Sequence, residues 1–305
     1  MGTSVVSTDL IQQLCLVSIT GILCMIGLMI QTFMVVVSVI DRLKGRPLTP
    51  ADLLITSIAT SRIIFQFLSL LFLLWITFNQ TFSTTFLIVV GILDISSTNC
   101  NIWLSALLSV FYSLKISNFY NVFFLYLKKI ISQRLLRVIV VSVLLSIGCS
   151  SVEVMMEYVD LRKNSTIHNV QRRTFKVLLF LVWNFIPFLF YVISLFPLLG
   201  SLCRHMYRMR REDNVTGHLD TYIKTIKFTV TSFCCFALFV TTNVFGSYFL
   251  DSCELLLVFN CFPLLHSIYI IYMTARLRSH VFTTLRGGTK CLLGRKVESR
   301  SGNQT

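Results

Sequence analysis

Three polar side chains in one long apolar stretch are the first candidates for chemistry in this sequence. Asp94, Thr98 and Asn101 are spaced i, i+4 and i+7, which places them on one face of an α-helix. In surroundings of low dielectric, a carboxylate attracts an ammonium group strongly. The spacing therefore predicts either a face that binds a ligand, with Asp94 favouring a cationic amine, or a face that serves internal hydrogen bonding.

A second candidate is Arg62, which lies in the middle of the apolar stretch 51–78. An arginine in such a stretch needs a carboxylate, backbone carbonyls or bound water as partners, and Gln31 in the preceding apolar stretch is one candidate. Two interpretations are open. Arg62 serves as a clamp between helices, which is the favoured one, or it contacts a ligand.

Other polar or aromatic residues lie at depths that match Asp94 within their own apolar stretches. Together they suggest an outward-opening cavity of mixed polarity for a small molecule, although aromatic residues in such stretches serve packing more often than binding. The residues are Trp75, Trp183, Asn184, Asn243, Glu254 and Asn260.

Enzyme and metal chemistry find no support in the sequence. The five histidines are isolated, and the adjacent pair Cys234 and Cys235 points to different faces of a helix. No nucleophile, base and orienting group can be assembled from the motifs. We therefore expect a protein that is not an enzyme and that needs neither a cofactor nor a metal ion.

The elements that must position these residues follow from composition. Hydrophobic residues make up 55% of the 305 and charged residues 13%, and the mean hydropathy is +0.76, far from a soluble domain. A membrane-spanning helix needs about 20 apolar residues, and seven such stretches are present. We predict an all-α, seven-transmembrane helix bundle that forms a single domain over 1–305, with spans at 14–40, 51–78, 86–114, 138–156, 177–203, 228–250 and 255–274.

The distribution of basic residues predicts the orientation of this bundle. Most of the 27 lysines and arginines fall in four segments that share one side, which is the cytoplasmic side by the positive-inside rule. The N-terminus is then outside, and the tail 275–305 is cytoplasmic. The net charge of +14 is spread over short segments rather than one domain face, so anionic membrane lipid rather than nucleic acid is the expected partner.

Two kinds of modification are predicted on this topology. The glycosylation sequons at Asn79 and Asn164 lie on the predicted outer side, and Asn164 is favoured because the connection that holds Asn79 is short. Cys291 lies in the basic, apolar tail and is a candidate for palmitoylation.

The inner end of the third stretch carries a specific sequence pattern. Residues 103–119, WLSALLSVFYSLKISNF, closely resemble the third-span signature of the type 2 (bitter) taste receptors, which runs L-S-x-F-Y-x-L-K-I-x-N-F. The matching residues are Leu108, Ser109, Phe111, Tyr112, Leu114, Lys115, Ile116, Asn118 and Phe119.

The resemblance to this family recurs in order along the chain. It includes the family's S-x-A-D and L-A-x-S-R-I patterns, which place Arg62 at the span-two arginine, and its P-F, L-x-S-L-x-x-H, P-x-x-H-S and K-L-K patterns in spans five and seven. The positions that carry these matches are 49–63, Pro187 and Phe188, 199–205, Pro263, His266 and Ser267, and 276–278.

The resemblance implies a G-protein-coupled receptor in the plasma membrane that binds bitter small molecules in an outer cavity and couples to a gustducin-type G protein. Val240 and Leu256 complete the ligand-facing set. The implied microswitch and G-protein face consists of Arg62, Tyr112, Lys115, His205, Lys224, Lys227, His266 and Ser267.

Departures from the family pattern concentrate in the predicted pocket. Asp94 stands where the family usually has tryptophan, Thr98 where asparagine is frequent and Val240 where tyrosine is frequent. Gln31 and Ser38 replace asparagines of the first span, and Thr274 replaces one at the end of the last span. These departures affect the identity of the agonist rather than the family.

Two other classes remain as alternatives. A vomeronasal type 1 receptor has the same size and topology, but we expect it to lack the F-Y-x-L-K and H-S patterns. A seven-helix transporter or channel is expected to show inverted repeats or broken helices, and neither is found in the sequence.

Overall fold

The computed structural model describes residues 2–78, 83–116, 122–162, 169–211, 216–249, 252–284 and 286, and all regular elements in these ranges are helical. In chain order they are α1 (Gly2–Leu43), α2 (Pro50–Phe78), α3 (Thr84–Ile116), α4 (Val122–Arg162), α5 (Asn169–Arg211), α6 (Thr216–Phe249) and α7 (Ser252–Met273). Each contains a stretch long and apolar enough to cross a membrane. The prediction of a seven-span, all-α bundle is therefore confirmed.

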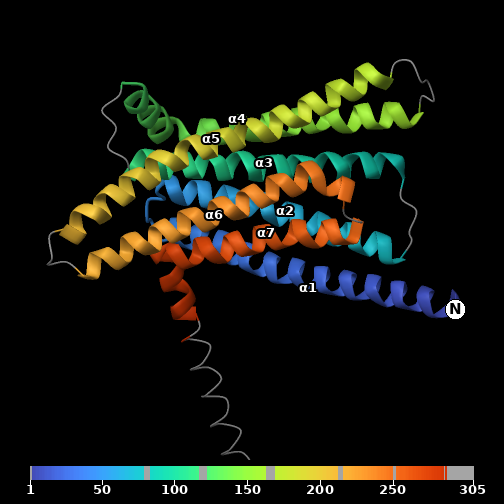
Figure 1. Cartoon of the computed structure of the whole chain (residues 1–305), viewed down its shortest axis with the longest axis horizontal. Coiled ribbons are helices and arrows are strands. Elements are labelled where there is room, and N and C mark those ends of the chain that lie inside the picture. The colour runs from blue at the N-terminus through green and yellow to red at the C-terminus, as the bar shows by residue number, and fades with distance from the viewer. Residues whose placement is uncertain are drawn as a thin grey trace, which may run out of the picture.

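The helices run side by side along the long axis of the molecule (Figure 1). Following the predicted topology, we call the end with the α2–α3, α4–α5 and α6–α7 connections the outer end, and the other end the inner end. α3 packs along α2, α4 and α5, whereas α1 packs on α2 and α7. This arrangement places α3 inside the bundle, as its polar residues on several faces require.

Several helices continue beyond the spans that hydropathy predicts. α1 begins at Gly2, α4 begins at Val122 and α5 covers Asn169–Arg211. The added turns of α1 and α5 carry polar residues that need not lie in lipid, whereas those that open α4 combine apolar residues with Lys128 and Lys129. α4 is bent at Arg134, where the backbone leaves helical geometry (φ −121°, ψ 19°). Figure 1 shows its first turns at an angle to the rest of the helix.

Two apolar clusters form the core of the bundle. The inner one joins α1, α2, α3, α4 and α7 around Met34, Ile58 and Leu104, and the other joins α3, α5, α6 and α7. Large apolar side chains elsewhere point away from the bundle, for example Leu144 and Phe196, which are 63% and 70% exposed. Such side chains fit a lipid environment, since exposed apolar surface of this extent is unusual in a soluble protein.

Polar side chains also link the helices inside the bundle. Asn99 of α3 donates a hydrogen bond to Ser150 of α4 (3.3 Å), and Ser109 of α3 bonds Ser194 of α5 (2.9 Å). Hydrogen bonds of this kind hold membrane helices together where the hydrophobic effect cannot.

The inner ends of α2 and α7 have defined boundaries. Thr49 caps α2: its hydroxyl accepts from the Asp52 backbone N–H (3.2 Å), while the Asp52 carboxylate accepts from the Thr49 backbone N–H (3.1 Å). This reciprocal pairing stabilises the first turn of a helix. After α7 the helix is interrupted at Thr274, and residues 275–284 form a further helical segment, which turns away from the bundle axis (Figure 1).

Candidate functional site

A cavity of ≈740 Å³ lies between the outer halves of α2, α3 and α7. Its volume is within the range of small-molecule sites, about 300–1,000 Å³. Three residues from the predicted ligand-facing set line it, one on each helix: Trp75, Asp94 and Leu256. The other lining residues are Phe65, Leu68, Ser69, Leu71, Phe72, Leu74, Phe78, Phe86, Leu87, Val90, Gly91, Leu255 and Phe259.

Asp94 is the innermost residue of α3 that lines this cavity, whereas on α2 the lining continues inward to Phe65. The lining residues of α3 run from Phe86 near the outer end to Asp94, which is about 12 Å along the helix at 1.5 Å per residue. Among the described residues that line the cavity, Asp94 is the only ionisable one, and its carboxylate forms no hydrogen bond or ion pair with another described residue. The cavity is therefore an apolar shaft with one acidic group in its inner part.

Below the cavity, Arg62 of α2 ties together helices α2, α3 and α7. Its side chain is fully buried. Nε donates to Asn101 Oδ1 of α3 (3.0 Å), Nη1 donates to Ser267 Oγ (2.6 Å) and to the Pro263 carbonyl (3.3 Å), and Nη2 lies 2.7 Å from His266 Nδ1. Because a guanidinium has donors only, His266 Nδ1 is the acceptor.

These contacts agree with the interpretation of Arg62 as a clamp between helices, and they correct its proposed partner. Gln31 of α1 makes no hydrogen bond to Arg62. Its Nε2 donates instead to Ser267 Oγ (2.6 Å), the same oxygen that Arg62 Nη1 uses. The glutamine thereby adds α1 to the cluster. We call Gln31, Arg62, Asn101, His266 and Ser267 the arginine cluster.

Asn101 belongs to this cluster rather than to the cavity lining. It shares a helical face with Asp94, but it lies seven residues further inward, about 10 Å at 1.5 Å per residue. At that depth α2 presents Arg62 to it, and Asn101 is 2% exposed. Its carbonyl oxygen accepts from Arg62 Nε and, at 3.5 Å, from Ser105 Oγ.

The remaining residues of the predicted ligand-facing set do not line the cavity. Trp183 stacks at a tilt on Trp103, with ring centroids 5.4 Å apart, and Asn184 accepts a hydrogen bond from Asn243 (3.2 Å). Val240 is buried in the core cluster of α3, α5, α6 and α7. Thr98 is partly buried on α3, and Glu254 is partly buried in the first turn of α7.

A smaller cavity of ≈260 Å³ lies between the inner halves of α3, α5, α6 and α7. Two predicted microswitch residues, Tyr112 and His266, line it. His266 thus borders this cavity while its Nδ1 contacts Arg62, and its ring stacks on Phe262 at 5.6 Å. Lys224 and Lys227 of α6 are exposed on the inner part of that helix.

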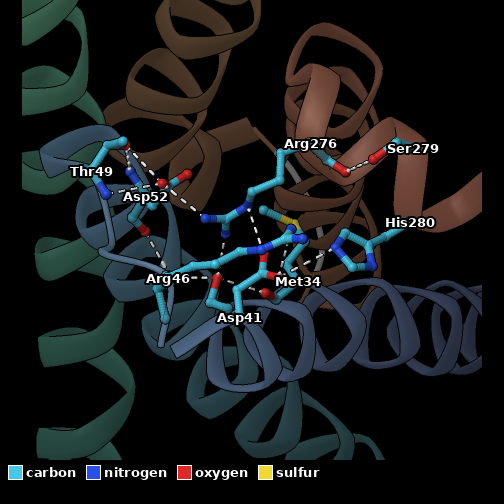
Figure 2. Close-up of polar contacts among 10 residues, drawn as sticks. Met34, Asp41, Arg46, Thr49, Asp52, Arg276, Ser279 and His280 are labelled. Carbon is cyan, nitrogen blue, oxygen red and sulfur yellow. Dashed lines mark hydrogen bonds and ion pairs between the residues drawn. The ribbon is translucent and has the colours of Figure 1, made fainter. Parts of the chain in front are cut away.

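An ionic cluster at the inner end was not predicted from the sequence. Arg276, from the segment after α7, lies between Asp41 of α1 and Asp52 of α2 (Figure 2), with Nε 3.3 Å from Asp41 Oδ2 and Nη1 2.8 Å from Asp52 Oδ2. Arg46 and His280 also approach Asp41, at 3.7 Å and 3.5 Å. We call these five residues the inner ionic cluster.

Ser38 extends the inner ionic cluster into α1 and α2. Its hydroxyl oxygen accepts from Arg276 Nη2 (3.1 Å) and from Thr56 Oγ1 (2.9 Å). Ser38 and Gln31, the two departures from family asparagines in the first span, therefore each contact α7 or the segment that follows it. Both still perform hydrogen bonding between helices.

Some residues of the predicted sites lie outside the part of the chain that the structure describes. Asn79, Asn164 and Cys291 are not among the described residues. Lys115 and His205 lie within α3 and α5, but the description does not extend to their side chains. Glycosylation and palmitoylation, and the contacts of these two side chains, stay predictions from the sequence.

Comparisons with known proteins agree on one family. A family model described as "Taste receptor protein (TAS2R)" matches residues 10–288. The chain is 28% identical over 292 residues to taste receptor type 2 member 9 of Homo sapiens, covering 89% of this chain and 93% of that protein. It is 29% identical over 288 residues to taste receptor type 2 member 50 of Gorilla gorilla gorilla, covering 88% and 95%.

A solved structure of squid rhodopsin has the same fold. Its TM-score is 0.62 with 12% sequence identity, and the match covers 91% of this chain and 86% of rhodopsin. At this identity the likeness concerns the arrangement of the seven helices.

Proposed function

Because this chain belongs to the taste receptor type 2 family, we propose that it detects bitter small molecules and activates a gustducin-type G protein. The family and the rhodopsin-like fold make it a G-protein-coupled chemosensory receptor of the plasma membrane, with several membrane spans, and not an enzyme. Small-molecule ligands and G-protein coupling follow from this class. Bitter agonists and the gustducin-type partner are the proposed part.

One observation carries the proposed mechanism. The ≈740 Å³ cavity is enclosed by α2, α3 and α7, and the arginine cluster directly below it ties the same three helices together. An agonist that fits one arrangement of these helices better than another shifts the population toward it. His266 transmits that shift, since it contacts Arg62 and also lines the inner cavity.

The direct test of the proposed function is calcium signalling in cells that express the receptor with a gustducin-type chimeric G protein. A broad panel of bitter compounds should include agonists that act only in cells with the receptor. If a receptor shown to be at the cell surface responds to none of them, the proposal fails.

The position of the agonist is tested with Leu256→Trp. The larger side chain enters the cavity, and overfilling a packed site costs about 1–3 kcal/mol, so agonist potency should fall by about five- to 150-fold. Leu265→Trp is the matched control, because Leu265 lies on the same helix but is 56% exposed. Equal potency in wild type and Leu256→Trp would place the agonist elsewhere.

G-protein activation is tested at Lys115, the penultimate residue of α3. We expect Lys115→Ala to abolish the agonist-dependent signal while agonist still binds, as measured by radioligand binding and G-protein activation in the same membranes. Lys44→Ala is the control for a lysine that serves only as an inner-side anchor. A fully active Lys115→Ala variant would assign Lys115 to anchoring as well.

A further inference from the structure

The shape and charge of the outer cavity identify a chemical class of agonist, on the premise of the proposed function. We propose that the receptor recognises amphiphilic amines that enter the cavity with the ammonium group first, so that the cation pairs with Asp94 and the apolar body fills the shaft above it.

The position of Asp94 sets the orientation of the ligand. On each helix the lining residues can be ordered by depth, and the deepest are Phe65 on α2, Asp94 on α3 and Phe259 on α7. The carboxylate thus lies in the inner part of the cavity, and Phe78 and Phe86 lie toward the outer end. A ligand with its charge at one end pairs with Asp94 and keeps its body in the longer outer part of the cavity only when the charged end points inward.

The residues that line the cavity favour an apolar ligand body, and the aromatic ones among them also attract an ammonium group. Apart from Asp94 and Ser69, the lining residues are aliphatic or aromatic or are glycine. The ring centroids of Trp75 and Phe72 on α2 lie 5.4 Å apart. Aromatic faces attract ammonium groups through cation–π interaction. A polar or multiply charged ligand would lose its hydration along this wall without gaining hydrogen bonds.

Arg62 is not a counter-ion for Asp94. Its hydrogen bonds go to Asn101, His266, Ser267 and the Pro263 carbonyl, and Asn101 lies about 10 Å inward of Asp94 along α3. A carboxylate in a membrane interior requires a cation or a set of donors. An ammonium ligand provides that cation, which is why its charge rather than its shape should dominate affinity.

The probes are butyl-, hexyl- and octyltrimethylammonium ions, with the alkanols of the same chain lengths as uncharged counterparts. We expect the ammonium ions to activate or to compete with an agonist, and their potency to increase with chain length as the shaft fills. Because a charged contact is replaced by a neutral one, Asp94→Asn should lower ammonium potency by about tenfold or more and leave alkanol potency unchanged.

Two variants separate charge from structure. Asp94→Glu retains the charge and should recover most of the ammonium response, whereas Leu93→Ala, at an exposed neighbouring position of α3, should behave as wild type. The inference is wrong if Asp94→Asn keeps its ammonium potency, if it loses ammonium and alkanol potency equally, or if only uncharged bitter compounds act on the wild type. The last result would contradict only the preference for amines and would agree with the proposed function. A receptor that responds to no bitter compound would contradict both.

Discussion

Replacing Arg62 by alanine should prevent most of the receptor from reaching the cell surface. The change leaves Asn101, His266 and Ser267 without their shared donor in the centre of the bundle, and it opens a cavity between α2, α3 and α7. Each buried acceptor that is left without a donor costs about 1–3 kcal/mol, and the sum is a large share of the stability of a typical domain. Surface labelling and thermal unfolding of the purified receptor would measure the loss.

The matched variants test whether hydrogen-bond geometry or charge is responsible. Arg62→Lys keeps the charge but not the planar fork that reaches three partners, so we expect it to remain strongly destabilised. Arg208→Ala removes an exposed arginine from α5 and should have little effect. Normal surface levels and normal thermal stability of Arg62→Ala would show that the arginine cluster does not hold the helices together.

Arg276→Ala should release the segment 275–284 from the bundle. Asp41 is 1% exposed and would lose its contact with Nε, while Asp52 would lose the 2.8 Å contact with Nη1. We expect a loss of about 2–3 kcal/mol, below the usual cost for a buried pair, because Arg276 is partly exposed and Arg46 and His280 remain near Asp41. Unfolding of the purified variant and hydrogen exchange over 275–284 would report the change.

A double-mutant cycle tests whether the contact between Asp41 and Arg276 itself contributes to stability. If Asp41 and Arg276 interact, Asp41→Asn combined with Arg276→Ala should be less destabilising than the sum of the single changes. Arg278→Ala, at an exposed arginine of the same segment, is the control. Additive effects of Asp41→Asn and Arg276→Ala would show that the observed proximity contributes no coupling.

The fold was predictable because lipid imposes a simple rule on the sequence. About 20 apolar residues are needed to cross a bilayer, and the seven stretches that satisfy this rule became seven helices. The ends of α1, α4 and α5 were not predictable in the same way. The added turns of α1 and α5 are polar helix, which hydropathy does not distinguish from a loop, and those that open α4 combine apolar residues with lysines in a segment too short to span a bilayer.

The candidate site was predicted in part because helical spacing determines a face but not the neighbours of that face. Asp94 lines the cavity, whereas Asn101 on the same face meets Arg62 one layer deeper. Similarly, depth alone grouped Trp183 and Asn184 with the ligand residues, although they pack against Trp103 and Asn243. The rotation of each helix and the identity of its neighbour decide these outcomes.

The inner ionic cluster was missed because its members are far apart in the sequence. Asp41 and Arg276 each stand at the end of an apolar stretch, where a charged residue is ordinary. One signal was present: Asp41 and Asp52 are acidic residues on a side of the protein where lysine and arginine predominate. A carboxylate there suggests a specific basic partner, but the sequence does not say which one.

The contacts of Arg62 also have a consequence for biosynthesis. The arginine enters the membrane with α2, but the Pro263 carbonyl that it contacts lies 201 residues later in the chain. At a synthesis rate of about 5–20 residues per second, α2 waits about 10–40 s for this partner. During that interval a buried cation lacks the acceptors of α7, so we expect α2 to insert late or to need assistance until the last helix is made.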